Sequence, residues 1–209
     1  MSADTLDTRT LEYRGLRFKV CHVADPDHRA PWEEYDGHGV VTDWLSIEQQ
    51  AERDRTKFYP LGTMQRDGSQ RFYDMDASIR KAIAEQWGVN DEERAKLKAG
   101  RLDGAEASEA QVLHRAVVLD RDYLNAWCND EWQYIGVVVQ LQDAGELVPT
   151  QSLWGIESND TAYLAAVARE LADQVIDEAN SALEQAMYKL RELQEQIQAA
   201  VLDRKDGTA

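Results

Sequence analysis

Apolar and polar residues alternate in the first third of the chain, a pattern typical of half-buried strands. The alternation over residues 10–23 flanks Arg14-Gly15, which predicts a hairpin or a kinked strand. A second hairpin is predicted over residues 57–75, where Asp67-Gly68 supplies the turn. Pro60 has no N–H to donate to a neighbouring strand, so we expect its strand to lie at the edge of a sheet.

The most strand-like segment is residues 134–141, with the sequence YIGVVVQL. Its β-branched and aromatic side chains suit a pleated, half-buried surface. The break at residues 143–146 contains a glycine where the chain must reverse, and residues 147–156 can return as the partner strand. We expect this hairpin to form the structural centre of the fold.

Helical spacing of apolar residues replaces the alternation in two later segments. A helix capped by Asp76 or Ser78 is expected to end before Gly88, and a longer helix covers residues 108–129. Between them, the charged residues 89–107 predict a short helix followed by a mobile loop. With the hairpins, these segments predict an α+β fold in which helices cover an antiparallel sheet.

A further helix begins after residues 158–160 and meets no glycine or proline until Gly207. About 44 helical residues would span roughly 65 Å, which is longer than a domain of this size is wide. Its first part carries the broad apolar stripe of a helix packed on a core. We therefore expect residues 10–175 to form one globular domain, residues 1–9 to be flexible, and residues 176–204 to extend the helix beyond the domain.

This helical extension carries a heptad seam in which large and small apolar residues alternate. Such alternation suits a close helix pair, including an antiparallel one. An isolated helix with an unpaired apolar stripe is a liability, so dimerisation is favoured over the alternative of a frayed, weakly packed helix end. The residues expected to carry the dimer contact are Ile176, Leu183, Leu190, Leu193 and Ile197, and the remaining positions of the seam are Ala179, Ala186 and Ala200.

Charge narrows the class of partner. The chain carries 39 acidic and 23 basic residues, which gives a net charge of −16. A surface this negative repels nucleic acid and anionic membrane, and it favours either a basic protein partner or simple solubility. We expect no direct contact with nucleic acid or with a membrane.

The compartment is expected to be the cytoplasm. Cys21 and Cys128 are the only cysteines, too few and too far apart to predict a disulfide framework. The first residues lack the basic and apolar regions of a signal peptide. No apolar run approaches the ~20 residues needed to span a bilayer.

One loop concentrates residues that could bind a transition metal. Histidine and aspartate are common metal ligands, but the zinc motifs H-E-x-x-H and C-x-x-C are absent. The alternative is a solvated acidic loop whose histidines form local hydrogen bonds, and no other cofactor is expected. The candidate metal ligands are His22, Asp25, Asp27, His28, Asp36 and His38.

Nucleophilic chemistry has weak support. Cys128 has acidic neighbours and is predicted to lie at the C-terminal end of a helix, and both features disfavour a thiolate. A Cys128–His114 nucleophile–base pair is an alternative, but no family signature accompanies it. The tryptophans are expected to anchor the core, while an exposed subset would contact a protein. The candidate partner-binding residues are Trp32, Glu33, Glu34 and Asp36.

Three patches stand out together: residues 30–39 with Trp44, residues 126–132 ahead of residues 136–139, and residues 152–158. As a set, they resemble small acidic proteins of tailed bacteriophages and prophages. The resemblance covers roughly residues 10–175 and implies a phage-encoded accessory role in a bacterial cytoplasm. It transfers no catalytic residue, because none is known for these proteins.

We therefore expect an acidic homodimer that docks on a basic host protein. It would act by binding, and it would inhibit that protein by mimicking the nucleic-acid polyanion, for example against host defence. The alternatives are a small metal-dependent enzyme that uses the His/Asp loop and an assembly component of the virion.

Overall fold

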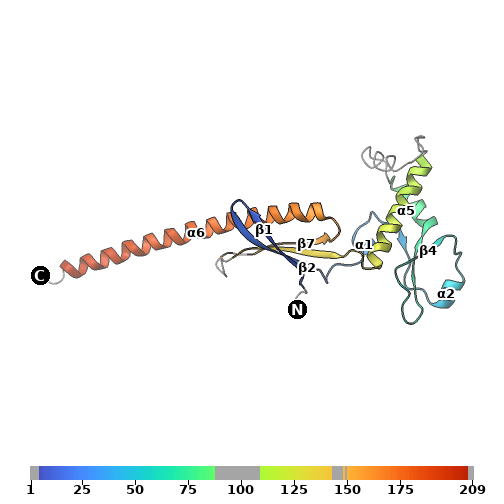
Figure 1. Cartoon of the computed structure of the whole chain (residues 1–209), viewed down its shortest axis with the longest axis horizontal. Coiled ribbons are helices and arrows are strands. Elements are labelled where there is room, and N and C mark those ends of the chain that lie inside the picture. Colours follow the sequence, from blue (N-terminus) through green and yellow to red (C-terminus); the bar gives the residue numbers. More distant parts are fainter. Residues whose placement is uncertain (1–4, 88–108, 143–147, 149, 207–209) are drawn as a thin grey trace. The chain divides into compact units, whose positions relative to one another are not determined.

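The computed structural model describes residues 5–87, 109–142, 148 and 150–206 of the 209-residue chain (Figure 1). The fold is α+β, with two antiparallel sheets and a long C-terminal helix, which confirms the predicted fold class. The chain divides into two compact units, one built from residues 1–26 and 134–209 and the other from residues 27–133. This differs from the single domain expected from the sequence, because the second unit is inserted between two neighbouring strands of the first.

The first unit contains a four-stranded antiparallel sheet in the order β1-β2-β6-β7. Arg14 and Gly15 have φ angles of 49° and 79° in the tight turn between the first two strands, so the predicted hairpin is confirmed. The predicted central hairpin is also confirmed, and Ile135 faces Ile156 across it. The strands are β1 (Thr5–Tyr13), β2 (Leu16–Ala24), β6 (Tyr134–Leu141) and β7 (Gln151–Glu157).

Residues 5–9 belong to β1, although the sequence predicts a flexible N-terminus over residues 1–9. Thr5 pairs with Val23 and Arg9 with Val20. The backbone hydrogen bonds to β2 stabilise this polar segment as a strand, and the amino-acid pattern does not show these bonds. The strand therefore starts before the apolar alternation at residue 10.

Helix α6 (Thr161–Asp206) covers this sheet with its N-terminal part. Asp160 accepts a hydrogen bond from the Tyr163 N–H at 2.9 Å and so caps the helix, within the segment predicted for the start. The core forms because apolar residues at helical spacing meet the inward side chains of alternating strands. From α6 it contains Leu164, Val167, Ala168, Leu171, Ala172 and Val175, and from the sheet Phe18, Val20, Ile135, Val137, Val139 and Ile156.

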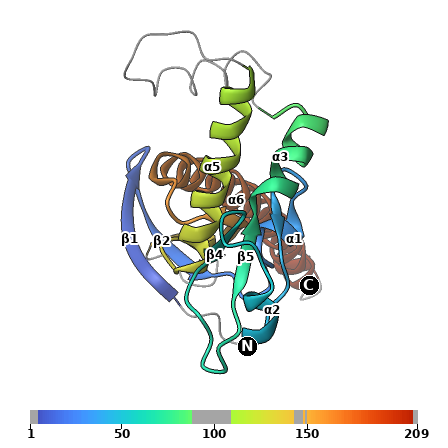
Figure 2. The same ribbon diagram turned by 90° about the vertical axis from the view of Figure 1, so that its right-hand side faces the viewer.

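The second unit contains a three-stranded sheet in the order β3-β5-β4, with two helices packed beside it (Figure 2). Pro60 lies in the edge strand β4, as predicted, and Gly68 has a φ of 83° in the turn that leads to β5. Leu61, Tyr73 and Leu124 are buried in its core. The elements are β3 (Val40–Val41), β4 (Phe58–Leu61), β5 (Arg71–Asp74), α3 (Met75–Ala84) and α5 (Glu109–Cys128).

Helix α3 begins earlier than predicted, at Met75. The cap is Asp74, whose carboxylate accepts the Ala77 N–H at 2.9 Å, and not Asp76 or Ser78. Two short helices, α1 (Pro31–Glu34) and α2 (Ile47–Ala51), add to this unit. The predicted short helix and mobile loop over residues 89–107 lie outside the described residues. In the described part of the chain, no helix is long and apolar enough to cross a membrane.

Candidate functional site

The second half of α6 carries a row of exposed apolar side chains. Every side chain from Asn180 to Val201 is exposed, so the sheet supports only the first part of the helix (Figure 1). Leucine and isoleucine side chains on this segment are 52% to 64% exposed. We call this row the α6 seam, and it consists of Leu183, Ala186, Leu190, Leu193, Ile197 and Ala200.

Ile176 differs from the other predicted dimer contacts. It is partly buried and packs against the core of the first unit. The seam available for a partner therefore begins after Ala179, which is also partly buried. The four predicted contacts Leu183, Leu190, Leu193 and Ile197 lie on the free part of the helix.

The α6 seam lies on a nearly neutral segment of a strongly acidic chain. Residues 180–201 contain three acids and two bases, whereas the whole chain has a net charge of −16. The acidity is shared by the two units. The first has 17 acids and nine bases, and the second has 22 acids and 14 bases, which leaves −8 on each.

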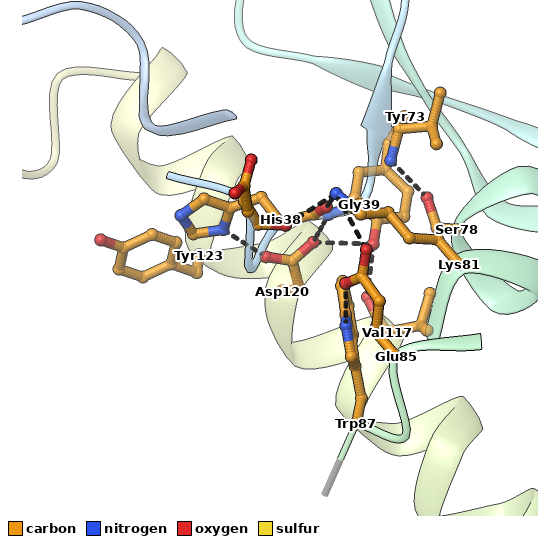
Figure 3. A network of polar contacts seen from close by, with 12 residues as sticks. His38, Gly39, Tyr73, Ser78, Lys81, Glu85, Trp87, Val117, Asp120 and Tyr123 are labelled. Atoms are coloured by element: carbon orange, nitrogen blue, oxygen red, sulfur yellow. Dashed lines mark hydrogen bonds and ion pairs between the residues drawn. The ribbon is translucent and has the colours of Figure 1, made fainter. Parts of the chain in front are cut away.

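Asp120 is the centre of a polar network in the second unit (Figure 3). Its Oδ1 lies 2.7 Å from His38 Nδ1, and its Oδ2 accepts the Gly39 N–H at 2.7 Å. The Tyr73 hydroxyl donates to the same Oδ2 at 2.8 Å. One carboxylate on α5 therefore holds the loop before β3 and a tyrosine of β5.

Lys81 and Tyr123 also contact this loop and help to fix its position. The Lys81 ammonium donates to the carbonyl oxygens of Asp36 and His38, both at 2.7 Å. The His38 ring stacks on the Tyr123 ring with centroids 5.5 Å apart and planes 9° from parallel. The His38 side chain is only 16% exposed. Its contacts hold the ring in place.

The nearby hydroxyl groups are used in packing. Ser78 Oγ donates to the Asp74 carbonyl at 2.6 Å and accepts the Val40 N–H at 2.8 Å. Burial, then the charge of Asp120, raises the pKa of Tyr73 well above its ordinary value, so this hydroxyl stays protonated. A carboxylate that orients a histidine is a common part of acyl-transfer sites, but both hydroxyls here are engaged with the fold. We interpret the network as a structural latch.

The six candidate metal ligands are not brought together. His22 and Asp25 belong to the first unit, and Asp27, His28, Asp36 and His38 belong to the second. Asp25 accepts the Gly155 N–H at 3.1 Å, and His28 Nε2 lies 3.4 Å from the Tyr35 hydroxyl. Among the described residues, no three His, Cys, Asp or Glu side chains gather as a metal ion would require. Proximity in sequence does not become proximity in space here, because the loop crosses from one unit to the other.

His22 lines a cavity in the first unit whose rim is basic. The cavity has a volume of about 220 Å³ and lies between β1, β2 and the start of α6. Arg9 and Arg169 are also on its rim, and Leu164 contributes to its apolar lining. Burial, followed by the charge of Arg9, lowers the pKa of His22. Basic neighbours disfavour a cation at this position.

The predicted partner-binding patch is partly used by the fold. The Trp32 ring meets Trp127 edge to face at 5.4 Å, and the Arg71 guanidinium lies 5.4 Å from Trp32 and 4.9 Å from Trp44. Glu33 is 4.0 Å from Arg71, a distance at which the two charges attract without a hydrogen bond. Trp32 is therefore half-buried, while the three predicted acids Glu33, Glu34 and Asp36 are exposed.

Sequence reasoning missed Arg71 and Asp120, and it named Trp44 in the resemblance but not among the partner-binding residues. Trp44 is 42% exposed, so it is the tryptophan of this cluster that a partner could reach. No sequence pattern indicated the role of Asp120. It is a polar residue in a helix whose apolar spacing gave the prediction, and its three contacts come from residues 47 to 82 positions away.

Cys128 does not have the surroundings of a nucleophile. The thiol is half-buried, and burial raises its pKa to about 11, against a smaller opposing effect of Arg71. His114 is exposed on the same helix, 14 residues or about four turns before the cysteine. These surroundings fit a structural cysteine better than a Cys128–His114 nucleophile–base pair.

Comparisons with protein-family models, with curated proteins and with solved structures found no match for this chain.

Proposed function

We propose that this protein acts by binding. It self-associates through the α6 seam and docks its acidic surface on a basic partner. The observation that carries the proposal is the row of four exposed leucine and isoleucine side chains between Leu183 and Ile197. Exposed apolar rows of this kind mark contact surfaces, because burying them removes about 25 cal/mol per Å² of unfavourable hydration.

The charge supports a basic partner for the rest of the surface. Each unit carries a net charge of −8, so a dimer would present acidic patches at several places. A field of this sign accelerates encounter with basic proteins and repels nucleic acid. Acidic side chains spaced along the dimer would occupy a groove that evolved to bind phosphates.

The sequence resemblance supplies a setting for this proposal. In a phage or prophage, an acidic accessory protein of this kind would act on a host protein that handles nucleic acid. It would inhibit that protein by occupying its nucleic-acid site. The exposed acids Glu33, Glu34 and Asp36 and the exposed Trp44 are suitable contacts for a basic groove.

A pull-down from bacterial lysate tests the proposal. The tagged protein should retain a basic nucleic-acid-binding protein at low salt and release it at high salt. Added duplex DNA should compete for the retained protein, since mimicry requires a shared site. Retention that resists both salt and DNA, or retention of no basic protein, would contradict polyanion mimicry.

A matched pair of variants locates the contact. Neutralising Glu33→Gln, Glu34→Gln and Asp36→Asn should weaken retention. Neutralising three exposed acids on another element, Glu184→Gln, Glu192→Gln and Glu195→Gln, removes the same charge from the helix. Equal loss in both sets would mean that net charge matters and this patch does not.

The α6 seam also fits an assembly component of the virion. The two functions differ in the size of the assembly, since an inhibitor needs only a dimer and a particle component would form a large closed ring. Light scattering at several concentrations separates them.

A further inference from the structure

We propose that two copies of α6 pair antiparallel, with Leu190 of one chain opposite Leu193 of the second copy. This inference rests on the proposed self-association, and it adds the direction and the register of the helix pair. The partner that covers the α6 seam is therefore a second copy of this chain.

The α6 seam continues the face of the helix that packs on the sheet. Ala172 and Val175 are fully buried against the sheet, and Ile176 is partly buried at its border. Ala179 and Leu183 follow at steps of three and four residues, so they lie on the same side of the helix. The first unit's own sheet therefore occupies one end of the side on which a partner helix must lie (Figure 1).

This continuity excludes a parallel pair that uses the whole seam. In a parallel pair, both sheets would lie at the same end of the assembly, and each would fill the space needed by the other copy's helix. In an antiparallel pair, the two sheets lie at opposite ends. Each helix then pairs only through its free half.

Among the described residues, the end of the sheet limits how far the two helices can overlap. Tyr13, the last residue of β1, and Arg14, in the turn after it, reach Asp173 of α6, with a hydrogen bond of 3.0 Å from Tyr13 and an ion pair of 3.2 Å from Arg14. With Leu190 opposite Leu193, the helix end at Asp206 lies opposite Asp177, one turn beyond this contact. Sliding the helices one heptad further would place residues 201–206 against the part of α6 that the sheet already covers.

This register gives layers of even thickness. The outer layers combine one large and one small residue, and the two central layers combine Leu190 with Leu193. The six layers span about 26 Å along the axis. In an in-register parallel pair, alanine would face alanine twice and leave gaps between leucine and isoleucine layers. The outer layers are Leu183 with Ala200 and Ala186 with Ile197, each occurring twice by symmetry.

Charge permits this contact between two acidic chains. The positions that flank the seam are Ala182, Met187, Lys189, Gln194 and Gln196, of which only the lysine is charged. Within residues 182–201, no acid of one copy lies opposite an acid of the other in this register. A basic partner protein would gain little from this neutral surface, which is why a second copy suits it better.

Cysteine cross-linking tests the direction. In a Cys21→Ala/Cys128→Ala background, Ala186→Cys and Ile197→Cys are placed on separate chains with different tags, mixed and oxidised with diamide. We expect the mixture to form the cross-linked heterodimer and each chain alone to stay uncross-linked, because identical positions would lie about 16 Å apart along the axis, beyond the reach of a disulfide. Self-cross-linking of each chain alone would overturn the antiparallel pair.

A second measurement leaves the seam intact. Spin labels on Ser181→Cys, on the opposite side of the helix, should be offset along the axis by about 31 Å in the antiparallel pair and by none in a parallel one. For the cross-linking, a chain with Ser181→Cys mixed with a chain with Ile197→Cys is the matched control, because neither an antiparallel nor a parallel pair brings these two positions together. A wild-type protein that is monomeric by light scattering would overturn the proposed self-association, whereas a dimer with short label distances would overturn only its direction.

Discussion

His38 and Asp120 are 82 residues apart in sequence, yet His38 Nδ1 and Asp120 Oδ1 are 2.7 Å apart in the second unit. The same carboxylate accepts hydrogen bonds from the Gly39 N–H and the Tyr73 hydroxyl. These contacts join a loop, a strand and a helix, so the integrity of the second unit depends on one side chain that is only 10% exposed.

We expect Asp120→Ala to lower the free energy of unfolding by about 3 kcal/mol or more, because it leaves buried donors without an acceptor. Asp120→Asn keeps the shape and should cost less. Urea denaturation followed by circular dichroism measures both. The control is Asp122→Ala, an exposed acid on the same helix, for which a change within about 0.5 kcal/mol is expected. Equal effects at the two positions would contradict the latch.

Gly39→Ala should destabilise the second unit by about 1–3 kcal/mol, since a Cβ there would overlap the buried Tyr73 hydroxyl. Gly37→Ala is the matched control two residues earlier, where a Cβ would have nothing within 4 Å. Thermal unfolding of the two variants compares them directly. A melting temperature that falls equally in both would mean that the loop, and not the contact with Tyr73, is sensitive to alanine.

The raised pKa of Tyr73 predicts a loss of stability in alkali. The unfolded chain releases this proton near pH 10, whereas the folded chain retains it, so the free energy of unfolding falls as pH rises above about 10. Below that pH the contribution is fully present. Urea midpoints at pH 8 and pH 10.5 should differ more for the wild type than for Tyr73→Phe, which cannot titrate. If the urea midpoint fell by the same amount in both proteins, groups other than Tyr73 would be responsible for the loss of stability in alkali.

Cys128 should react slowly with alkylating agents while the protein is folded. Its raised pKa of about 11 leaves little thiolate at pH 8. In a Cys21→Ala background, we expect iodoacetamide to modify the native thiol at least roughly tenfold more slowly than the urea-unfolded thiol. Native and unfolded rates that agree would mean that this thiol is open to solvent and would reopen a reactive role.

Replacing Leu183 and Leu190 with aspartate should convert an oligomer into a monomer by light scattering, because two charges would face apolar side chains across the pair. Ser181→Asp with Tyr188→Asp is the control, since these residues lie on the opposite side of the same helix. Tyr188 is 63% exposed, close to the 64% of Leu190, so exposure alone does not distinguish the two variants. An unchanged mass in the leucine variant would leave the seam without a partner helix.

Local patterns predicted the elements well. The turn at Arg14-Gly15, the strand at residues 134–141 and the start of α6 near Asp160 were all predicted from spacing and turn chemistry. These signals are local, because the spacing of apolar residues within one strand or helix of this length is enough to identify it. The same reason explains why the long helix was predicted to outrun its domain.

Contacts between distant segments could not be predicted. The division into two units depends on β2 pairing with β6 across an insertion of more than a hundred residues, and no local period records that pairing. The metal hypothesis failed to gain support for a related reason, since the His/Asp loop spans the boundary between the units at residues 26–27. Asp120 and Arg71 owe their surroundings to the fold and not to their sequence neighbours.

The pairing of β2 with β6 makes the insertion separable. Ala24 faces Ile135 across the two strands, and the Asp25 N–H donates to the Tyr134 carbonyl at 3.2 Å, so both ends of the inserted segment leave from adjacent positions on one ladder. A two-residue turn such as Asn-Gly can close an antiparallel pair at that point. The second unit can thus be regarded as a module grafted into a hairpin, and evolution could exchange it without altering the sheet or the helix that projects from it.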